Sequence, residues 1–222
     1  RVSDALMPHA LAGVKVDLLK DLAVGFQAAL QTPEVRNKIT PKFRRVFAVA
    51  VGPAHPLQKK RKRAQFASSD AEAFWKRIAS SREPALEQEG STLLTGASAT
   101  ARALQEALDK VRNMYPRPDD DVIFFFSGLG ASGKGPTGPE PYLVLADTDP
   151  DKVEETGVAL ASVLEQLKAL GAGRVSVVVD AGFGKRSRGK SAGASKSAGR
   201  AARYPDPGKQ KGLALFLAGP ED

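Results

Sequence analysis

The sequence predicts an α/β protein in which a mainly parallel β-sheet is flanked by helices. Two observations predict this fold class. Short apolar runs, typical of strands buried on both faces, alternate along the chain with longer segments whose apolar residues recur at helical spacing. Repeated strand–helix–strand units of this kind form parallel sheets with helices on both faces. The length of 222 residues suits one such domain with an additional segment.

Residues 1–43 are predicted to form an N-terminal helical segment. Apolar residues recur at helical spacing from Leu11 to Leu30, and Pro33 then interrupts the pattern. A helix of this kind covers a sheet face or reaches a partner. The remaining residues, 44–222, are assigned to the α/β domain.

Strand and helix signals alternate through the α/β domain. The run 122–126, which contains three consecutive phenylalanines, is the strongest signal for a buried strand. The residues from Ser69 to Glu72 fit a capping box and predict the start of a helix. Further helices are expected at 99–114 and 158–170, where apolar residues line one face. The other expected strands cover residues 46–51, 92–94, 142–146, 174–179 and 213–217.

The composition excludes several classes of protein. Hydrophobic residues make up 42% of the chain and charged residues 26%, as in globular domains and unlike disordered chains. Without cysteine, the chain has no disulfide framework, thiolate metal site or cysteine nucleophile. Its two histidines, His9 and His55, lie far apart in the sequence, so we expect no metal site and no cofactor. No apolar run approaches the roughly 20 residues that span a bilayer, and we expect a cytoplasmic protein.

The net charge of +8 is concentrated in one stretch of the chain. Residues 185–211 hold nine lysines or arginines and one acid, Asp206, in a background of glycine, serine and alanine, which predicts a flexible basic loop. A second basic cluster covers residues 59–63. Such runs suit contact with nucleic acid, an anionic lipid surface or an acidic partner. Two solvated loops are the favoured interpretation, because only Tyr204 is present to stack a base. The candidate contact residues are Lys59, Lys60, Arg61, Lys62, Arg63, Lys185, Arg186, Arg188 and Lys190.

The segment from Gly128 to Gly135 nearly matches a Walker phosphate loop. Such a loop needs a Ser or Thr hydroxyl after its lysine and a helix that begins there. Here Lys134 is followed by Gly135 and Pro136, which prevents a helix in that register. The sequence therefore argues against nucleotide hydrolysis.

Two strand ends carry a more specific pattern. The strand at 122–126 continues as FFFSGLG, and the strand at 174–179 continues as VVVDAGFG. These segments resemble the two catalytic segments of caspase-like peptidases, including metacaspases, in which the first supplies a histidine and the second a cysteine. Further blocks occur in the family's order, among them RRVFAVAVG, SSDAEAFWKRI and PYLVLADTD, so that the resemblance covers residues 44–184. It implies a three-layer sandwich with a mainly parallel sheet.

The chain departs from the family at both catalytic positions. Leu129 stands where the resemblance places the histidine, and Gly182 stands where it places the cysteine. Peptide hydrolysis in this family needs a thiolate to attack the carbonyl and an imidazole to transfer the proton. The resemblance therefore implies a pseudo-peptidase that binds a protein partner, as a scaffold or regulator of an active protease or a signalling assembly.

Two alternatives belong to other classes of function. A hydrolase with a non-standard nucleophile would use Ser127, although neither loop offers a histidine as its base. A polyanion-binding module would use the two basic runs, and its binding would weaken steeply with salt.

Three residues are candidates for contact with a substrate or partner: Asp180, Ser127 and Asp147. By resemblance, Asp180 binds a basic side chain, and its alternative role is to cap backbone amides at the strand end. Asp147 belongs to an alternating acidic series that ends at Asp151 and is similar to calcium loops. Because the EF-hand glycine and final glutamate are missing, with Val158 at the twelfth position, we expect helix-capping and turn roles for this series.

Overall fold

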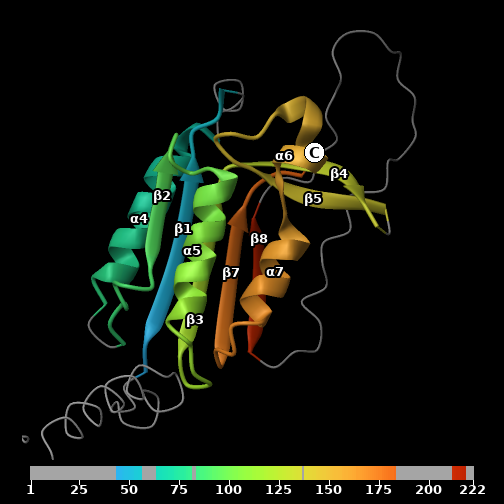
Figure 1. Ribbon diagram of the computed structural model, residues 1–222. Helices are drawn as coiled ribbons and strands as arrows, with labels where there is room; N and C mark the ends of the chain where they lie inside the picture. Colours follow the sequence, from blue (N-terminus) through green and yellow to red (C-terminus); the bar gives the residue numbers. More distant parts are fainter. Residues whose placement is uncertain (1–43, 57–63, 82–83, 137, 184–211, 219–222) are drawn as a thin grey trace, which may run out of the picture. The chain divides into compact units, whose positions relative to one another are not determined.

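The computed structural model describes residues 44–56, 64–81, 84–136, 138–183 and 212–218 (Figure 1). All of them belong to the unit Arg44–Asp222. The helical segment expected at residues 1–43 and both basic runs lie outside these described ranges. None of the described helices is long and apolar enough to cross a membrane.

A five-stranded parallel sheet forms the centre of the domain, with the order β2-β1-β3-β7-β8. Every residue of β1 is buried, as its uninterrupted apolar run predicts for a strand covered on both faces. The sheet confirms the fold class expected from the sequence. Its strands are β1 (Val46–Pro53), β2 (Thr92–Gly96), β3 (Asp121–Ser127), β7 (Arg174–Asp180) and β8 (Leu213–Ala218).

Helices cover both faces of this sheet, which makes a three-layer sandwich. On one face α5 (Ala101–Asn113) and α7 (Leu160–Lys168) bury their apolar stripes against alternate residues of the strands, and both helices pass in front of the sheet in Figure 1. The opposite face carries α4 (Ala67–Ala79), which contacts β1, β2 and β3. There the rings of Phe74 and Phe125 stack with centroids 4.3 Å apart.

A second, antiparallel sheet of three strands follows β3. The glycine-rich segment that is similar to a Walker loop is β4 (Leu129–Gly135), which pairs with β5 (Gly138–Val144). No helix begins after Lys134, as expected. The strand expected at 142–146 belongs to this second sheet and begins at Gly138. The remaining elements are η2 (Ala64–Phe66), η3 (Pro150–Lys152), α6 (Val153–Thr156) and β6 (Val158–Ala159).

Two predicted helix starts are wrong. The expected capping box at Ser69 does not form, because α4 begins at Ala67 and the Ser69 hydroxyl donates to the carbonyl of Phe66 at 2.8 Å. Contacts with the sheet move this start: the Ser68 hydroxyl donates to the carbonyl of Gly52, which fixes the first turn against β1. The second helix begins at Leu160, because the two residues before it pair with β5 as β6.

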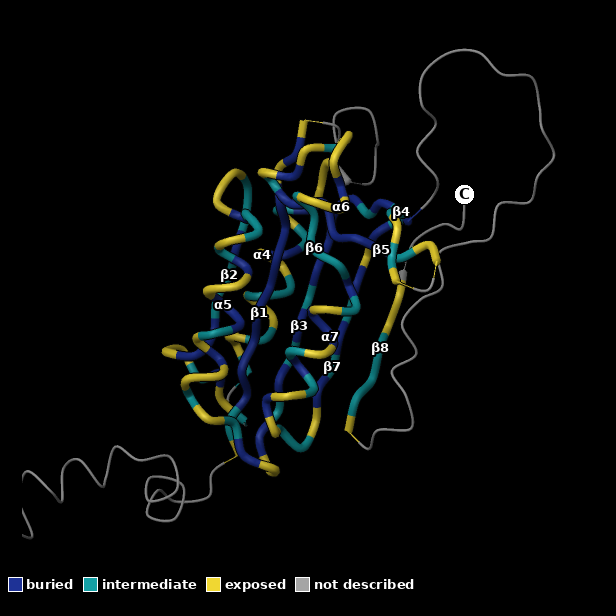
Figure 2. The backbone as a smooth tube through the Cα atoms, turned by 45° about the vertical axis from the view of Figure 1, so that its right-hand side comes forward, coloured by how far each residue is buried: buried dark blue, intermediate teal, exposed yellow. Residues whose placement is uncertain are grey.

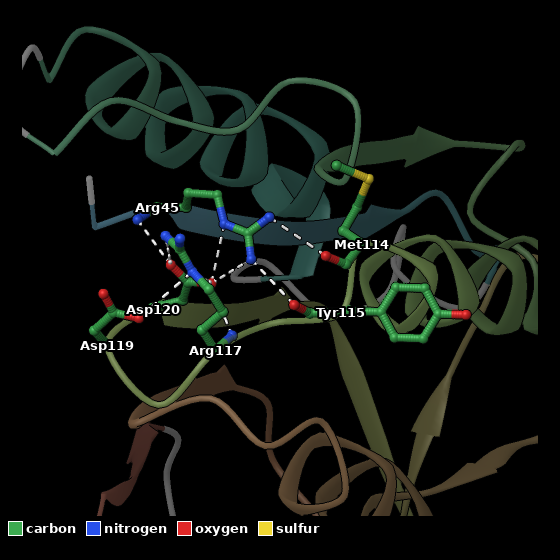
Figure 3. A network of polar contacts seen from close by, with 6 residues as sticks. All are labelled: Arg45, Met114, Tyr115, Arg117, Asp119 and Asp120. Carbon is green, nitrogen blue, oxygen red and sulfur yellow. Dashed lines mark hydrogen bonds and ion pairs between the residues drawn. The ribbon is translucent and has the colours of Figure 1, made fainter. Parts of the chain in front are cut away.

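Charged residues close the amino ends of the strands (Figure 3). The carboxylate of Asp120 has no exposed surface, and it accepts hydrogen bonds from the guanidinium of Arg45 at 2.6 and 3.0 Å and from that of Arg117 at 3.1 Å. The backbone amides of both arginines also donate to it. Burial by itself raises the pKa of Asp120, but these hydrogen bonds outweigh it and hold the pKa below its usual value.

Arg45 also connects the amino end of β1 to the end of α5. Arg45 donates to the carbonyls of Met114 at 3.3 Å and Tyr115 at 3.1 Å. Tyr115 has a φ of 48°, in the left-handed region where glycine is the usual residue after a helix. The network therefore joins the start of β1, the approach to β3 and the end of α5.

Candidate functional site

The candidate site lies at the carboxyl ends of the parallel strands, which we call the carboxyl edge. It comprises the last residues of three strands and the residues that follow them: 52–55 at the end of β1, 127–129 at the end of β3 and 180–183 at the end of β7. In open parallel sheets, the loops beyond these strand ends meet on one side and carry the functional residues. The two segments that resemble caspase catalytic segments are both at this edge.

Ser127 is held by a carboxylate from the helix over the sheet. The serine is buried, with 3% of its surface exposed, and its hydroxyl donates to Oδ2 of Asp70 at 3.0 Å. Asp70 lies in the first turn of α4. Fifty-seven residues separate the two, so no local sequence pattern could indicate their contact.

The first turn of α4 is fixed on the sheet, which places Asp70. The Ser68 hydroxyl donates to the carbonyl of Gly52 at 2.8 Å and accepts from the amide of Gly96 at 3.2 Å. The helix approaches β1 so closely that a Cβ added to Gly52 would lie 2.2 Å from the carbonyl oxygen of Ala67. Glycine is therefore required at position 52 for this approach.

Asp180 lies beside Ser127 in the sheet register. Because Phe125 faces α4 and side chains alternate along a strand, Ser127 and Asp180 project from that same face. The carbonyl of Asp180 accepts from the amide of Gly128 at 3.0 Å, whereas its side chain is exposed and has no hydrogen bond or ion pair within the described residues. Within the described residues, the Asp180 carboxylate therefore does not cap backbone amides at the strand end, the alternative role that the sequence suggested. The site thus presents one hydroxyl with a bonded carboxylate from Asp70 and a second, exposed carboxylate.

Leu129 is a packing residue of the second sheet. Only 7% of its surface is exposed, and it belongs to an apolar cluster with Ala131, Tyr142, Val144 and Val153. Burial, together with the charges of two nearby glutamates, raises the pKa of the Tyr142 phenol. The position that the resemblance assigns to a histidine is thus occupied by a leucine directed into a small core.

The two segments at the carboxyl edge contact each other through Gly130. A Cβ added to Gly130 would lie 2.5 Å from the ring of Phe183 and 2.8 Å from the carbonyl oxygen of Gly182. Phe183 is itself buried. The segment that contains Gly182 therefore packs closely on the start of β4.

His55 also lies at this edge, which its place in the sequence did not suggest. It follows β1, is buried, and its Nε2 is 2.9 Å from the carbonyl oxygen of Thr148. A ring nitrogen in that position donates to the carbonyl. His55 therefore joins the loop after β1 to the loop after β5.

The acidic series after β5 has the capping and turn roles expected for it. Oδ1 of Asp147 accepts from the amide of Ala101 at the start of α5, at 3.0 Å. Oδ1 of Asp149 accepts from the amide of Asp151 at 2.8 Å. Asp147 thus binds the amino end of α5, 46 residues earlier in the chain, and Asp149 caps the short helix η3 that follows it.

The predicted polyanion contacts lie outside the described residues. The nine basic residues proposed for polyanion contact lie in residues 57–63 and 184–211, for which no structure is described. Among the described residues, no group of three or more His, Cys, Asp or Glu side chains is arranged to hold a metal ion.

No protein-family model matches the chain, and no curated protein is significantly similar to it in sequence.

Proposed function

We propose that this chain is a catalytically inactive caspase-like domain that acts by binding another protein. The observation that carries the proposal is the burial of Leu129 in an apolar cluster, at the position where the resemblance implies a catalytic histidine. A leucine cannot transfer a proton, and Gly182 has no side chain that could attack a carbonyl. The sequence contains no cysteine to replace it.

The carboxyl edge offers a contact for a basic side chain of the partner. Asp180 is exposed at the end of β7, and its carboxylate is not neutralised by a cation within the described residues. The carboxylate of Asp70 lies on the same face, bonded to the Ser127 hydroxyl. A lysine or arginine beside Asp180 would form a charge-assisted hydrogen bond. The partner would be an active protease or a signalling protein that this domain restrains or positions.

One contact favours a second candidate, a hydrolase that uses Ser127. Its hydroxyl already donates to the carboxylate of Asp70 at 3.0 Å, which is the geometry of a nucleophile and a base. A serine nucleophile ordinarily has an imidazole as its base, and the ring of His55 bonds to the carbonyl of Thr148. The binding domain is therefore the better supported of the two.

Cleavage profiling separates these candidates. The unmodified chain would be incubated with a mixed peptide library, with and without calcium, and the products identified by mass spectrometry. We expect no cleavage above a buffer control for the unmodified chain and for Ser127→Ala. Cleavage that survives repurification and is lost in both Ser127→Ala and Asp70→Asn would establish the hydrolase instead.

Binding to Asp180 has its own test. Fluorescence anisotropy would measure the affinity of the chain for a labelled arginine-containing peptide library, with Asp180→Asn as the variant. Loss of a charge-assisted hydrogen bond is expected to weaken binding about tenfold. Asp109→Asn is the matched control, because Asp109 is also at the surface but pairs with Arg112 on α5. Equal affinities in the two variants would remove Asp180 from the contact.

A further inference from the structure

Strand β8 is an apolar strand at the edge of the parallel sheet. It pairs with β7, and within the described part of the chain no strand pairs with its other side. Its six residues include no charge and no proline. Phe216 is 58% exposed and Leu217 is 38% exposed, and Figure 2 contrasts this partly exposed strand with the fully buried β1. Natural proteins protect such edges with charges, prolines or bulges, because an unprotected edge pairs with other chains.

The register shows which backbone groups face outward. Val175 aligns with Leu213, and its amide donates to the carbonyl of Gly212 at 2.6 Å. In a parallel ladder, a residue bonds to the two neighbours of its aligned partner, so the even-numbered residues of β8 bond to β7. The amides and carbonyls of Leu213, Leu215 and Leu217 therefore point to the free edge.

One face of this edge is also apolar and lacks a described covering helix. Phe216 aligns with Val178, and Val178 aligns with Phe125. All three side chains therefore project from the face of the sheet that α4 covers. The described contacts of α4 are concentrated on β1, β2 and β3. An added strand at the edge would cover the Phe216 ring, and burying this apolar surface would favour binding.

The charge of the neighbouring sequence selects the occupant. The basic stretch 185–211, which carries the entire net charge of +8, ends two residues before Leu213. Only Gly212 separates Lys211 from Leu213, so the basic stretch is continuous in sequence with the start of the strand. A second copy would bring the same positive charge and be repelled, whereas an acidic chain would be attracted.

We propose that the outer edge of β8 binds an extended segment of an acidic partner protein as an added strand. Its backbone would pair with Leu213, Leu215 and Leu217, its apolar side chains would cover Phe216, and its acidic residues would lie near the Gly212 end. This surface runs along the outer side of β8, whose last residue, Ala218, aligns with Asp180 of the carboxyl edge. The proposed binding does not depend on whether the domain is catalytically inactive.

The test uses the full chain and a fluorescein-labelled peptide of four glutamates followed by alternating valine and threonine, with its reversed sequence as a second probe. Phe216→Ser removes the apolar contact, and Leu217→Pro removes an outward amide and keeps the bonds to β7. We expect each change to weaken peptide binding about tenfold or more, measured by anisotropy. Phe66→Ser is the matched control, since Phe66 is 55% exposed and lies before α4; it should leave the affinity unchanged. Circular dichroism would verify the folding of each variant.

Two results would overturn the proposal. If the peptide binds but its affinity falls only with salt and not in the β8 variants, the basic stretch alone attracts it. If neither probe binds and sedimentation shows a dimer that Phe216→Ser dissociates, the occupant is a second copy. Peptide cleavage reports on the carboxyl edge, so failure of that experiment is distinct from failure of this one.

Discussion

At the amino ends of the strands, Asp120 is wholly buried and accepts hydrogen bonds from two guanidinium groups. At the carboxyl ends, by contrast, Asp180 is exposed, and its side chain has no hydrogen bond or ion pair with the described residues. Both are aspartates at an end of a parallel strand or beside one. The first has all of its hydrogen-bonding capacity used within the fold, and the second keeps its capacity for a ligand. The same residue type therefore serves the structure at one edge and is available for binding at the other.

Ser127 and Asp70 lie between these extremes. Their hydrogen bond joins α4 to β3, as a structural contact would, but it places a hydroxyl and a carboxylate beside the exposed Asp180. The comparison predicts that removing a charge at the amino ends of the strands costs much stability. Removing a side chain at the carboxyl edge should cost little, unless the change opens the apolar cluster around Leu129.

The largest effect is expected from Asp120→Ala. This change leaves the guanidinium groups of Arg45 and Arg117 without their buried counter-charge, and the free energy of unfolding should fall by about 3–5 kcal/mol. Urea denaturation would measure it. Asp109→Ala is the control, because it breaks an exposed pair with Arg112 and should cost at most about 1 kcal/mol. Equal losses in the two variants would contradict the structural role of Asp120.

The next effect is expected from Leu129→Ala. Because Leu129 is 7% exposed within an apolar cluster, its truncation leaves a cavity and should cost about 2–4 kcal/mol in urea denaturation. The half-exposed Leu217 is the control, where the same change should cost less than about 1 kcal/mol. A negligible loss at position 129 would mean that this side chain is not packed, which would weaken the proposed inactivity.

The stabilising contact of Asp120 also predicts a pH dependence. Its pKa in the folded chain is lower than the unfolded value of about 3.9, so its contribution is present above that value and is lost as pH falls through the folded pKa. The free energy of unfolding should therefore decrease below about pH 4. Asp120→Asn has no titrating carboxyl group at this position, so its free energy of unfolding should decrease less steeply over the same pH range. Urea denaturation at a series of pH values would measure both slopes. An unchanged slope would show that other carboxylates account for the acid sensitivity.

The smallest effect is expected from Ser127→Ala. The change removes one hydrogen bond to a carboxylate that water can still reach in part, and it should cost about 0.5–1.5 kcal/mol. Asp70→Asn retains an acceptor oxygen and should cost less. Thermal and urea denaturation of both variants would measure the difference. A loss as large as that of Asp120→Ala would assign this pair to the structure rather than to a binding site.

The sequence alone identified the elements whose pattern is local. The short apolar runs predicted to be strands form β1, β3, β7 and β8. The predicted sheet, mainly parallel and between two layers of helices, is confirmed. No helix begins after Lys134, as the glycine and proline that follow it predict, and this segment is strand β4. The turn role of Asp149 is also local, because its carboxylate accepts from the amide two residues later.

The tertiary structure decided where distant residues meet. The pairs Ser127–Asp70 and Arg45–Asp120 join residues that are 57 and 75 positions apart, and neither leaves a periodic signal in the sequence. The capping box failed at Ser69 because the neighbouring Ser68 bonds to the sheet and moves the start of the helix. Local propensity fixes the type of an element, since it depends on neighbours along the chain, whereas the register between strands places side chains together only after the sheet has formed.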